Sequence, residues 1–180
     1  MLWRTHFLAS AAAGLLLAGH TDAKTAALSA GVAGIAALLP DVDSPDSKIG
    51  RMIPVIPRLF KTVVGHRGAL HSAIGVAAVF ILAALFLGWR AHIPKMHYLI
   101  LAGYLSHLVM DSFNPQGVPW LWPYGKRFGL PLVQTGSLLE RFVVMPGMVL
   151  LVAWFGITKL WLWFPTIKAV FSKILKGGIL

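Results

Sequence analysis

The sequence predicts an all-α fold, a polytopic membrane helix bundle with about five transmembrane helices. Of the 180 residues, 57% are hydrophobic and only 12% are charged, and the mean hydropathy is +0.75. A soluble globular domain has roughly 25% charged residues. Spans of roughly 20 residues each, with their connections, use the whole length. We therefore expect residues 1–180 to form a single integral-membrane domain.

The apolar segments follow one another along the chain. They cover about residues 3–19, 25–40, 66–89, 95–113 and 141–164. The first two are rich in small residues, and Gly31 and Gly34 are expected to allow close helix packing. The first segment also resembles a secretory signal, because Arg4 precedes an apolar run that ends near Ala23. We expect it to be retained as a span, since an equally apolar segment follows it.

The connections carry polar and aromatic residues. Asp41, Asp43 and Asp46 directly follow the second segment, which is typical either of a surface turn or of a ligand cluster, and their spacing does not fit an EF-hand. Basic and apolar residues alternate through residues 48–61, which favours a segment on the membrane surface. The connection after residue 113 contains Pro, Gly and aromatic residues typical of an interfacial lid. The tail after residue 165 is expected to be a short surface helix.

His107 and Asp111 lie four residues apart at the end of the fourth apolar segment. This spacing places both side chains on one face of a helix. An imidazole and a carboxylate at membrane depth are costly unless they pair with each other, face protein or hold an ion. The couple is therefore either a hydrogen-bonded structural pair or part of a functional site.

The alternating topology decides between these possibilities, because it brings other polar residues to the same membrane face. The candidate ligands expected there are His6, Asp41, Asp43, His66, His71, His107, Asp111 and Glu140. The opposite face has His20, Asp22, His92 and His97, in short loops where polar residues are solvated. Clustered histidines and carboxylates at membrane depth favour a metal site over scattered structural roles.

The chain has no cysteine, so a metal must be held by imidazole, carboxylate or water. These ligands favour Zn²⁺, with Mn²⁺ or Mg²⁺ as alternatives. Eight candidate ligands exceed the needs of one four-coordinate ion, so we expect more than one ion.

Basic residues predict the orientation. The site side carries Arg4, Lys48, Arg51, Arg58, Lys61, Arg67, Lys126, Arg127 and Arg141, whereas the two opposing loops carry Lys24, Arg90 and Lys95. The positive-inside rule then places the site and the N-terminus in the cytoplasm, although three lysines in the tail oppose this bias. The net charge of +10 could suggest nucleic acid, but in a membrane protein it favours contact with anionic lipids. No direct nucleic acid binding is expected.

Paired metal ions suit hydrolysis of a phosphoester. Asp43 or Asp111 could bridge the ions or accept the proton from water. Arg67 could clamp a phosphate, and Lys126 and Arg127 could attract anionic headgroups, although all three could equally serve only to set the topology. A serine nucleophile is disfavoured, because no serine lies in a nucleophile elbow.

Five sequence elements together resemble a known family. They are LLPDVDSPDSKIGR, HRGALHS, SHLVMD, GVPWLWP and TGSLLE. This combination resembles the YdjM-like inner-membrane metal-dependent hydrolases over nearly the whole chain. The resemblance implies metal ligands at His6, Asp41, Asp43, His66, His71, His107 and Asp111, with Glu140 as a further candidate. It also implies an association with the SOS repressor LexA. The His-x-x-x-Asp element is similar, more distantly, to that of zinc-dependent phospholipase C and P1-type nucleases, which implies a phosphoesterase.

The sequence therefore favours a membrane-embedded metal-dependent hydrolase that acts on a phospholipid or another anionic amphiphile at the cytoplasmic face of a bacterial inner membrane. A metal or proton transporter is an alternative, because intramembrane His and Asp residues also mark ion pathways. The concentration of polar groups at one end of the spans favours the hydrolase. A regulatory membrane anchor for a cytoplasmic partner is a further alternative.

Overall fold

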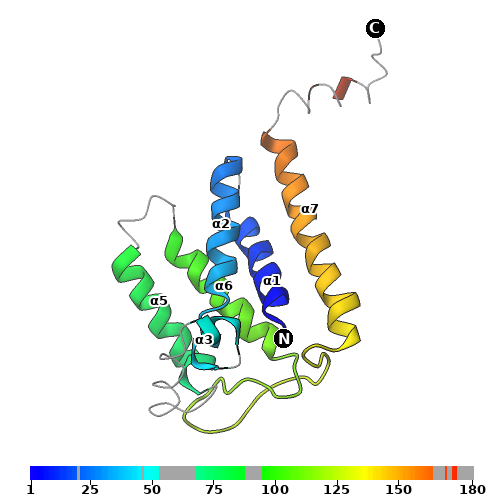
Figure 1. The fold of residues 1–180 in the computed structure, drawn as a ribbon. Helices are drawn as coiled ribbons and strands as arrows, with labels where there is room; N and C mark the ends of the chain where they lie inside the picture. The colour runs from blue at the N-terminus through cyan, green and yellow to red at the C-terminus, as the bar shows by residue number, and fades with distance from the viewer. Residues whose placement is uncertain are drawn as a thin grey trace.

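In the computed structural model, the chain is an all-helical protein (Figure 1). The structure describes residues 1–19, 21–45, 47–52, 68–87, 95–163, 169, 172 and 173. The longer helices are α1 (Trp3–Leu17), α2 (Ala23–Ala36), α5 (Ala73–Leu87), α6 (Met96–Asp111) and α7 (Met145–Trp163). The short ones are η1 (Pro40–Asp43), α3 (Lys48–Met52), η2 (Ala69–His71) and the π-helical turn η3 (Glu140–Val144). No strand occurs among these residues, so the predicted helical class is confirmed.

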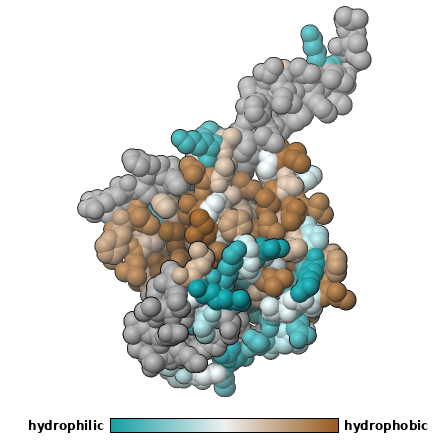
Figure 2. Space-filling view, in the orientation of Figure 1, coloured by the Kyte–Doolittle hydropathy of each residue, from teal (hydrophilic) through white to brown (hydrophobic). Residues whose placement is uncertain are grey.

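Each predicted apolar segment contains one of the longer helices. Within the described residues, two helical stretches are long and apolar enough to cross a membrane. They are Ala23–Asp43, which includes α2 and η1, and Glu140–Thr158, which includes η3 and most of α7. The helix Ala73–Leu87 is apolar but shorter. Five spans therefore stay a prediction. Figure 2 shows hydrophobic residues across the middle of the visible face and hydrophilic residues gathered at the end that holds the N-terminus.

Helices α1, α2 and α6 pack closely because small residues lie between them. A Cβ atom at Gly14 of α1 would clash with the carbonyl oxygen of Ser29, and one at Gly103 of α6 would clash with that of Ala33. At Gly34 an added Cβ would lie 2.7 Å from the Phe7 ring, as the small-residue pattern predicts. Gly31 has nothing within 4 Å of such an atom, so it does not serve helix packing here.

Helix α5 packs on α6, and a small core fixes the turn that precedes it. Tyr104, Leu108 and Val118 are fully buried together. The Tyr104 hydroxyl donates a hydrogen bond of 2.5 Å to the carbonyl oxygen of Leu70. This bond ties η2, and with it His71, to the middle of α6.

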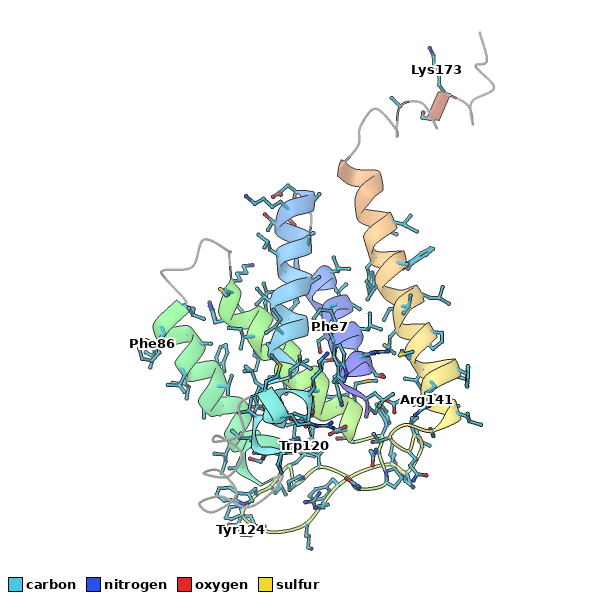
Figure 3. All side chains as sticks on the ribbon, viewed as in Figure 1. Phe7, Phe86, Trp120, Tyr124, Arg141 and Lys173 are labelled. Atoms are coloured by element: carbon cyan, nitrogen blue, oxygen red, sulfur yellow. The ribbon has the colours of Figure 1, made fainter. Side chains whose placement is uncertain are left out.

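Residues 112–139 form the long connection that was predicted to be a lid, and Figure 1 shows it crossing the N-terminal end of the bundle. Trp120 donates from Nε1 to Ser112 Oγ at 3.0 Å, and Val118 pairs with Phe128 through two backbone hydrogen bonds. Figure 3 shows Trp120 against the ends of the helices and Tyr124 at the outer edge of the loop. Tyr124 is 83% exposed, so the aromatic residues split between anchoring the loop and facing outward.

Candidate metal centre

Two overlapping groups of side chains converge where α1, α6, η1 and η2 meet. The first group contains His6 from α1 with His107 and Asp111 from α6, all of them buried. His6 Nε2 lies 3.2 Å from Asp111 Oδ1, and His107 Nε2 lies 3.5 Å from Asp111 Oδ2. The helical spacing of His107 and Asp111 therefore does place both side chains on one face, and α1 adds a second imidazole to it.

The second group contains Asp41 from η1, His71 from η2 and the same His107. Asp41 Oδ1 lies 3.7 Å from His71 Nε2 and 3.8 Å from His107 Nε2. Residues separated by up to about seventy positions thus reach one point. His107 stands between the two groups and belongs to both.

The donor atoms of this cluster are buried without hydrogen-bond partners among the described residues. They are both ring nitrogens of His6 and of His71, together with His107 Nε2. Buried polar atoms in folded proteins are nearly always satisfied, and a bound ion is one of the few explanations when no protein group satisfies them. The 3.2 Å approach of His6 Nε2 to Asp111 Oδ1 does not change this, because it does not meet the geometry of a hydrogen bond.

The separations fit a shared cation. Bonds of 2.0–2.1 Å from a tetrahedral zinc ion place neighbouring N and O ligands about 3.3–3.4 Å apart. The observed separations of 3.2 Å, 3.5 Å, 3.7 Å and 3.8 Å scatter around this value. The three separations of 3.5 Å or more are too long for good hydrogen bonds, and all four suit ligands arranged about an ion.

The neighbours of His107 orient its ring. Its Nδ1 lies 2.6 Å from the carbonyl oxygen of Ala37, which can only accept, so Nδ1 carries the proton. The lone pair then lies on Nε2, which faces the two carboxylates. Such a backbone contact on the far nitrogen is the usual means of fixing the tautomer of a metal-binding histidine.

His71 is held between two carboxylates. Asp43 Oδ2 lies 3.7 Å from its Nδ1, on the other nitrogen from Asp41. Burial alone would lower the pKa of His71, but the nearby negative charges of Asp41 and Asp43 outweigh it and raise that pKa to about 9. The surroundings of His71 therefore favour a positive charge. Without a bound metal, the protonated imidazole ring supplies that charge.

The predicted ligands thus separate into those that converge and those that do not. His6, Asp41, His71, His107 and Asp111 lie in the two groups. Asp43 is buried but belongs to neither group, and it lies behind His71 as a carboxylate that orients the ring. His66 and Arg67 lie outside the described residues.

Glu140, a further predicted ligand, has a different role in the structure. Its Oε1 accepts a hydrogen bond from the backbone N–H of Leu2 at 2.6 Å, and its Oε2 accepts one from Gly136 at 2.7 Å. Glu140 is fully buried and outside both groups. It fastens the start of α1 to the turn before η3. The α-amino nitrogen of Met1 lies 2.6 Å from Asp111 Oδ1, so a cationic group is already next to the first ligand group.

The sequence interpretation missed the residues beside the centre. A pocket of about 690 Å³ opens next to Asp41 and is lined by Trp3, Lys48 and Arg51 among others. The sequence assigns the two basic residues to a membrane-surface segment and to the charge bias that sets the topology. The sequence could have indicated these two residues, because both lie within ten residues of Asp41. It could not have indicated Trp3, which only the fold brings to the pocket.

The fold and the cluster define a class of protein, an all-helical protein with a buried histidine and carboxylate centre at one end of its bundle. The profile of the family described as "YdjM inner membrane protein" matches residues 1–177. The chain belongs to this family, and the family description agrees with the predicted membrane location.

Three curated relatives support this assignment. The protein is 41% identical over 114 residues to "Inner membrane protein YdjM" of Escherichia coli (strain K12), a match that covers 60% of this chain and 57% of the relative. The protein of the same name from Shigella flexneri matches to the same extent. The "Uncharacterized protein YvsG" of Bacillus subtilis (strain 168) is 32% identical over 120 residues, which are 65% of this chain and 71% of the relative. The chain thus aligns with little more than half the length of the YdjM proteins. No solved structure matches it.

Proposed function

We propose that the protein is a membrane-embedded metal-dependent hydrolase, most simply a phosphoesterase that acts on an amphiphilic substrate at the cytoplasmic face of the inner membrane. One observation carries the proposal: five imidazole and carboxylate side chains from four elements converge, and every ring nitrogen among them except His107 Nδ1 is buried without a hydrogen-bond partner among the described residues. A structural role would require these nitrogens to be satisfied within the protein. A metal ion would satisfy one nitrogen of each ring.

The residues fit a divalent ion. The site offers imidazole and carboxylate without sulfur, which suits Zn²⁺ and also Mn²⁺. His107 can bind only one ion, because its Nδ1 is bonded to Ala37 and one lone pair remains on Nε2. In a centre with two ions, the second ion would therefore rely on the other described ligands, with water completing its coordination.

The bound metal would lower the pKa of a water molecule and stabilise negative charge on phosphoryl oxygens. The chain's own residues supply the remaining functions. Asp111 and Asp41 each have a second carboxylate oxygen that could bridge ions or accept the proton of the attacking water. Asp43 holds the ring of His71 in place from behind. Small residues pack α1 and α6 closely against α2, which helps to hold His6 at its distance from Asp111.

The experiment is hydrolysis by purified protein in detergent, after chelation and reloading with Zn²⁺ or Mn²⁺. Phosphate release is compared for phosphatidic acid, a water-soluble aryl phosphate and a nucleotide. The proposal expects activity that depends on metal, that prefers the lipid and that is lost in Asp111→Asn. His97→Gln is the matched control, since His97 lies at the other end of α6. Activity that survives Asp111→Asn would contradict the proposal, and metal uptake into vesicles without hydrolysis would favour a transporter.

A further inference from the structure

The pocket beside the centre shares a wall with it. Asp41, a member of the second ligand group, is also one of the residues that line the pocket. The start of α1 forms another wall, with Leu2 and Trp3, and α3 contributes Lys48 and Arg51. A molecule in the pocket would therefore lie directly against Asp41, one of the proposed ligands.

The basic residues of the pocket are held at a fixed distance from Asp41. Ser47 Oγ donates to the carbonyl oxygen of Asp41 at 2.7 Å and accepts from the backbone N–H of Gly50 at 2.8 Å. A Cβ atom at Gly50 would clash with the carbonyl oxygen of Ser44, so α3 can pack against η1 only with glycine there. The short helix is thus tied to the element that carries Asp41.

Lys48 is further oriented by an aromatic ring. Its Nζ lies 4.0 Å from the ring centroid of Trp3, within the range of a cation–π contact. This contact connects α3 with the start of α1, on which His6 also lies. Lys48 and Arg51 are one turn apart on α3, and both line the pocket, so both side chains can reach one anion.

We propose that this pocket binds the phosphate headgroup of an amphiphilic substrate, with Lys48 and Arg51 as the residues that determine specificity. The inference rests on the proposed function and assigns its substrate site. Arginine binds phosphate in a bidentate manner and lysine binds it as a point charge. Leu2, Trp3 and Met52 line the same pocket and provide apolar surface for the part of the substrate next to the headgroup.

This assignment replaces the role expected of Lys126 and Arg127. Both lie on the exposed part of the loop 112–139 and neither lines the pocket. Lys126 and Arg127 carry the same two positive charges as Lys48 and Arg51 but lie outside the pocket, so their substitution is the matched control. The carboxylate of Asp41 would repel a phosphate in the metal-free protein, so binding should be tighter with the metal than without it.

The test measures binding of dodecylphosphonate, a probe that cannot be hydrolysed as a phosphoester, to metal-loaded protein in detergent by calorimetry. Lys48→Gln and Arg51→Gln should each weaken binding by about tenfold, since each removes one charge-assisted contact. The double variant Lys126→Gln with Arg127→Gln should bind as the unaltered protein does. Metal content, measured on the same samples, should be unchanged in all variants.

Three outcomes would overturn the inference. The first is equal loss in the control variant, which would make the effect one of overall charge. The second is unchanged binding in both α3 variants. The third is equal affinity for inorganic phosphate and dodecylphosphonate, which would leave an anion site without selection for an amphiphile. Absence of bound metal or of hydrolysis in the unaltered protein would instead reject the proposed function, and a selective loss of phosphonate binding in the α3 variants would still support the pocket.

Discussion

The imidazole rings of His6 and His107 stack with their centroids 3.8 Å apart and their planes 17° from parallel. Two protonated rings at this distance would repel each other strongly in a buried site. The arrangement therefore requires at least one neutral ring, the form that binds metal. The stacking also places both Nε2 atoms beside Asp111, at 3.2 Å and 3.5 Å.

Because His107 belongs to both ligand groups, its loss should be the most damaging of the single histidine changes. His107→Ala is expected to reduce bound metal to a small fraction of that in the unaltered protein, whereas His6→Ala and His71→Ala each leave one group intact and should retain part of it. Elemental analysis of protein purified without chelator measures this. His97→Ala controls for loss of any histidine on α6. Equal metal content in His107→Ala would contradict the assignment.

The sequence predicted the convergence better than the details of coordination. The spacing of His107 and Asp111 and the alternation of apolar segments sufficed to bring His6, Asp41 and His71 to the same end, because helix periodicity and segment order fix these positions. The separation of Asp43 from the ligands could not be predicted. It depends on a 3₁₀ turn at η1 that directs Asp41 and Asp43 to different nitrogens of His71.

The role of Glu140 was also outside the reach of sequence reasoning. A buried carboxylate near the site was expected to bind metal, but backbone N–H groups from Leu2 and Gly136 occupy both of its oxygens. Only the path of the chain at η3 makes these two donors available. The contact between Lys48 and Trp3 could not be predicted from the sequence either, because it joins elements from separate parts of the chain.

The raised pKa of His71 predicts opposite pH dependences with and without metal. In the metal-free protein the pKa of about 9 exceeds the unfolded value of about 6.5. The stabilisation from this proton is fully present below about pH 6.5 and is lost as pH rises through about 9. Metal must displace the proton, so metal affinity should rise by up to tenfold per pH unit over the same range.

Calorimetric titration with Zn²⁺ at pH 6.5, 7.5 and 8.5, in buffers of different ionisation enthalpy, would count the protons released. His71→Gln should bind more weakly and should release one proton fewer. An affinity that does not change between these pH values in the unaltered protein would show that His71 is already neutral, and would exclude it as the group that controls binding.

Glu140→Gln distinguishes a structural carboxylate from a metal ligand. Glutamine has one carbonyl oxygen, so at least one of the two backbone donors loses its acceptor. A buried donor without a partner costs about 1–3 kcal/mol, and the thermal midpoint of the variant should fall accordingly. Metal content should stay within error of the unaltered protein. Loss of metal with an unchanged thermal midpoint would instead indicate that Glu140 is a metal ligand.

The last prediction concerns the packing that positions the histidines. Gly103 lies one turn before His107 on α6, and an added Cβ would clash with the carbonyl oxygen of Ala33. Backbone cannot yield as a flexible side chain can, so Gly103→Ala should force α6 away from α2 and cost about 1–3 kcal/mol. The carbonyl of Ala37 that orients His107 lies on the same side, one turn further along. Metal affinity should therefore fall together with stability, although no ligand is altered. Gly147→Ala on α7 is the control, because an added Cβ there meets nothing within 4 Å. If Gly103→Ala lowered the thermal midpoint but bound metal as tightly as the control, the approach of α6 to α2 would be irrelevant to the geometry of the centre.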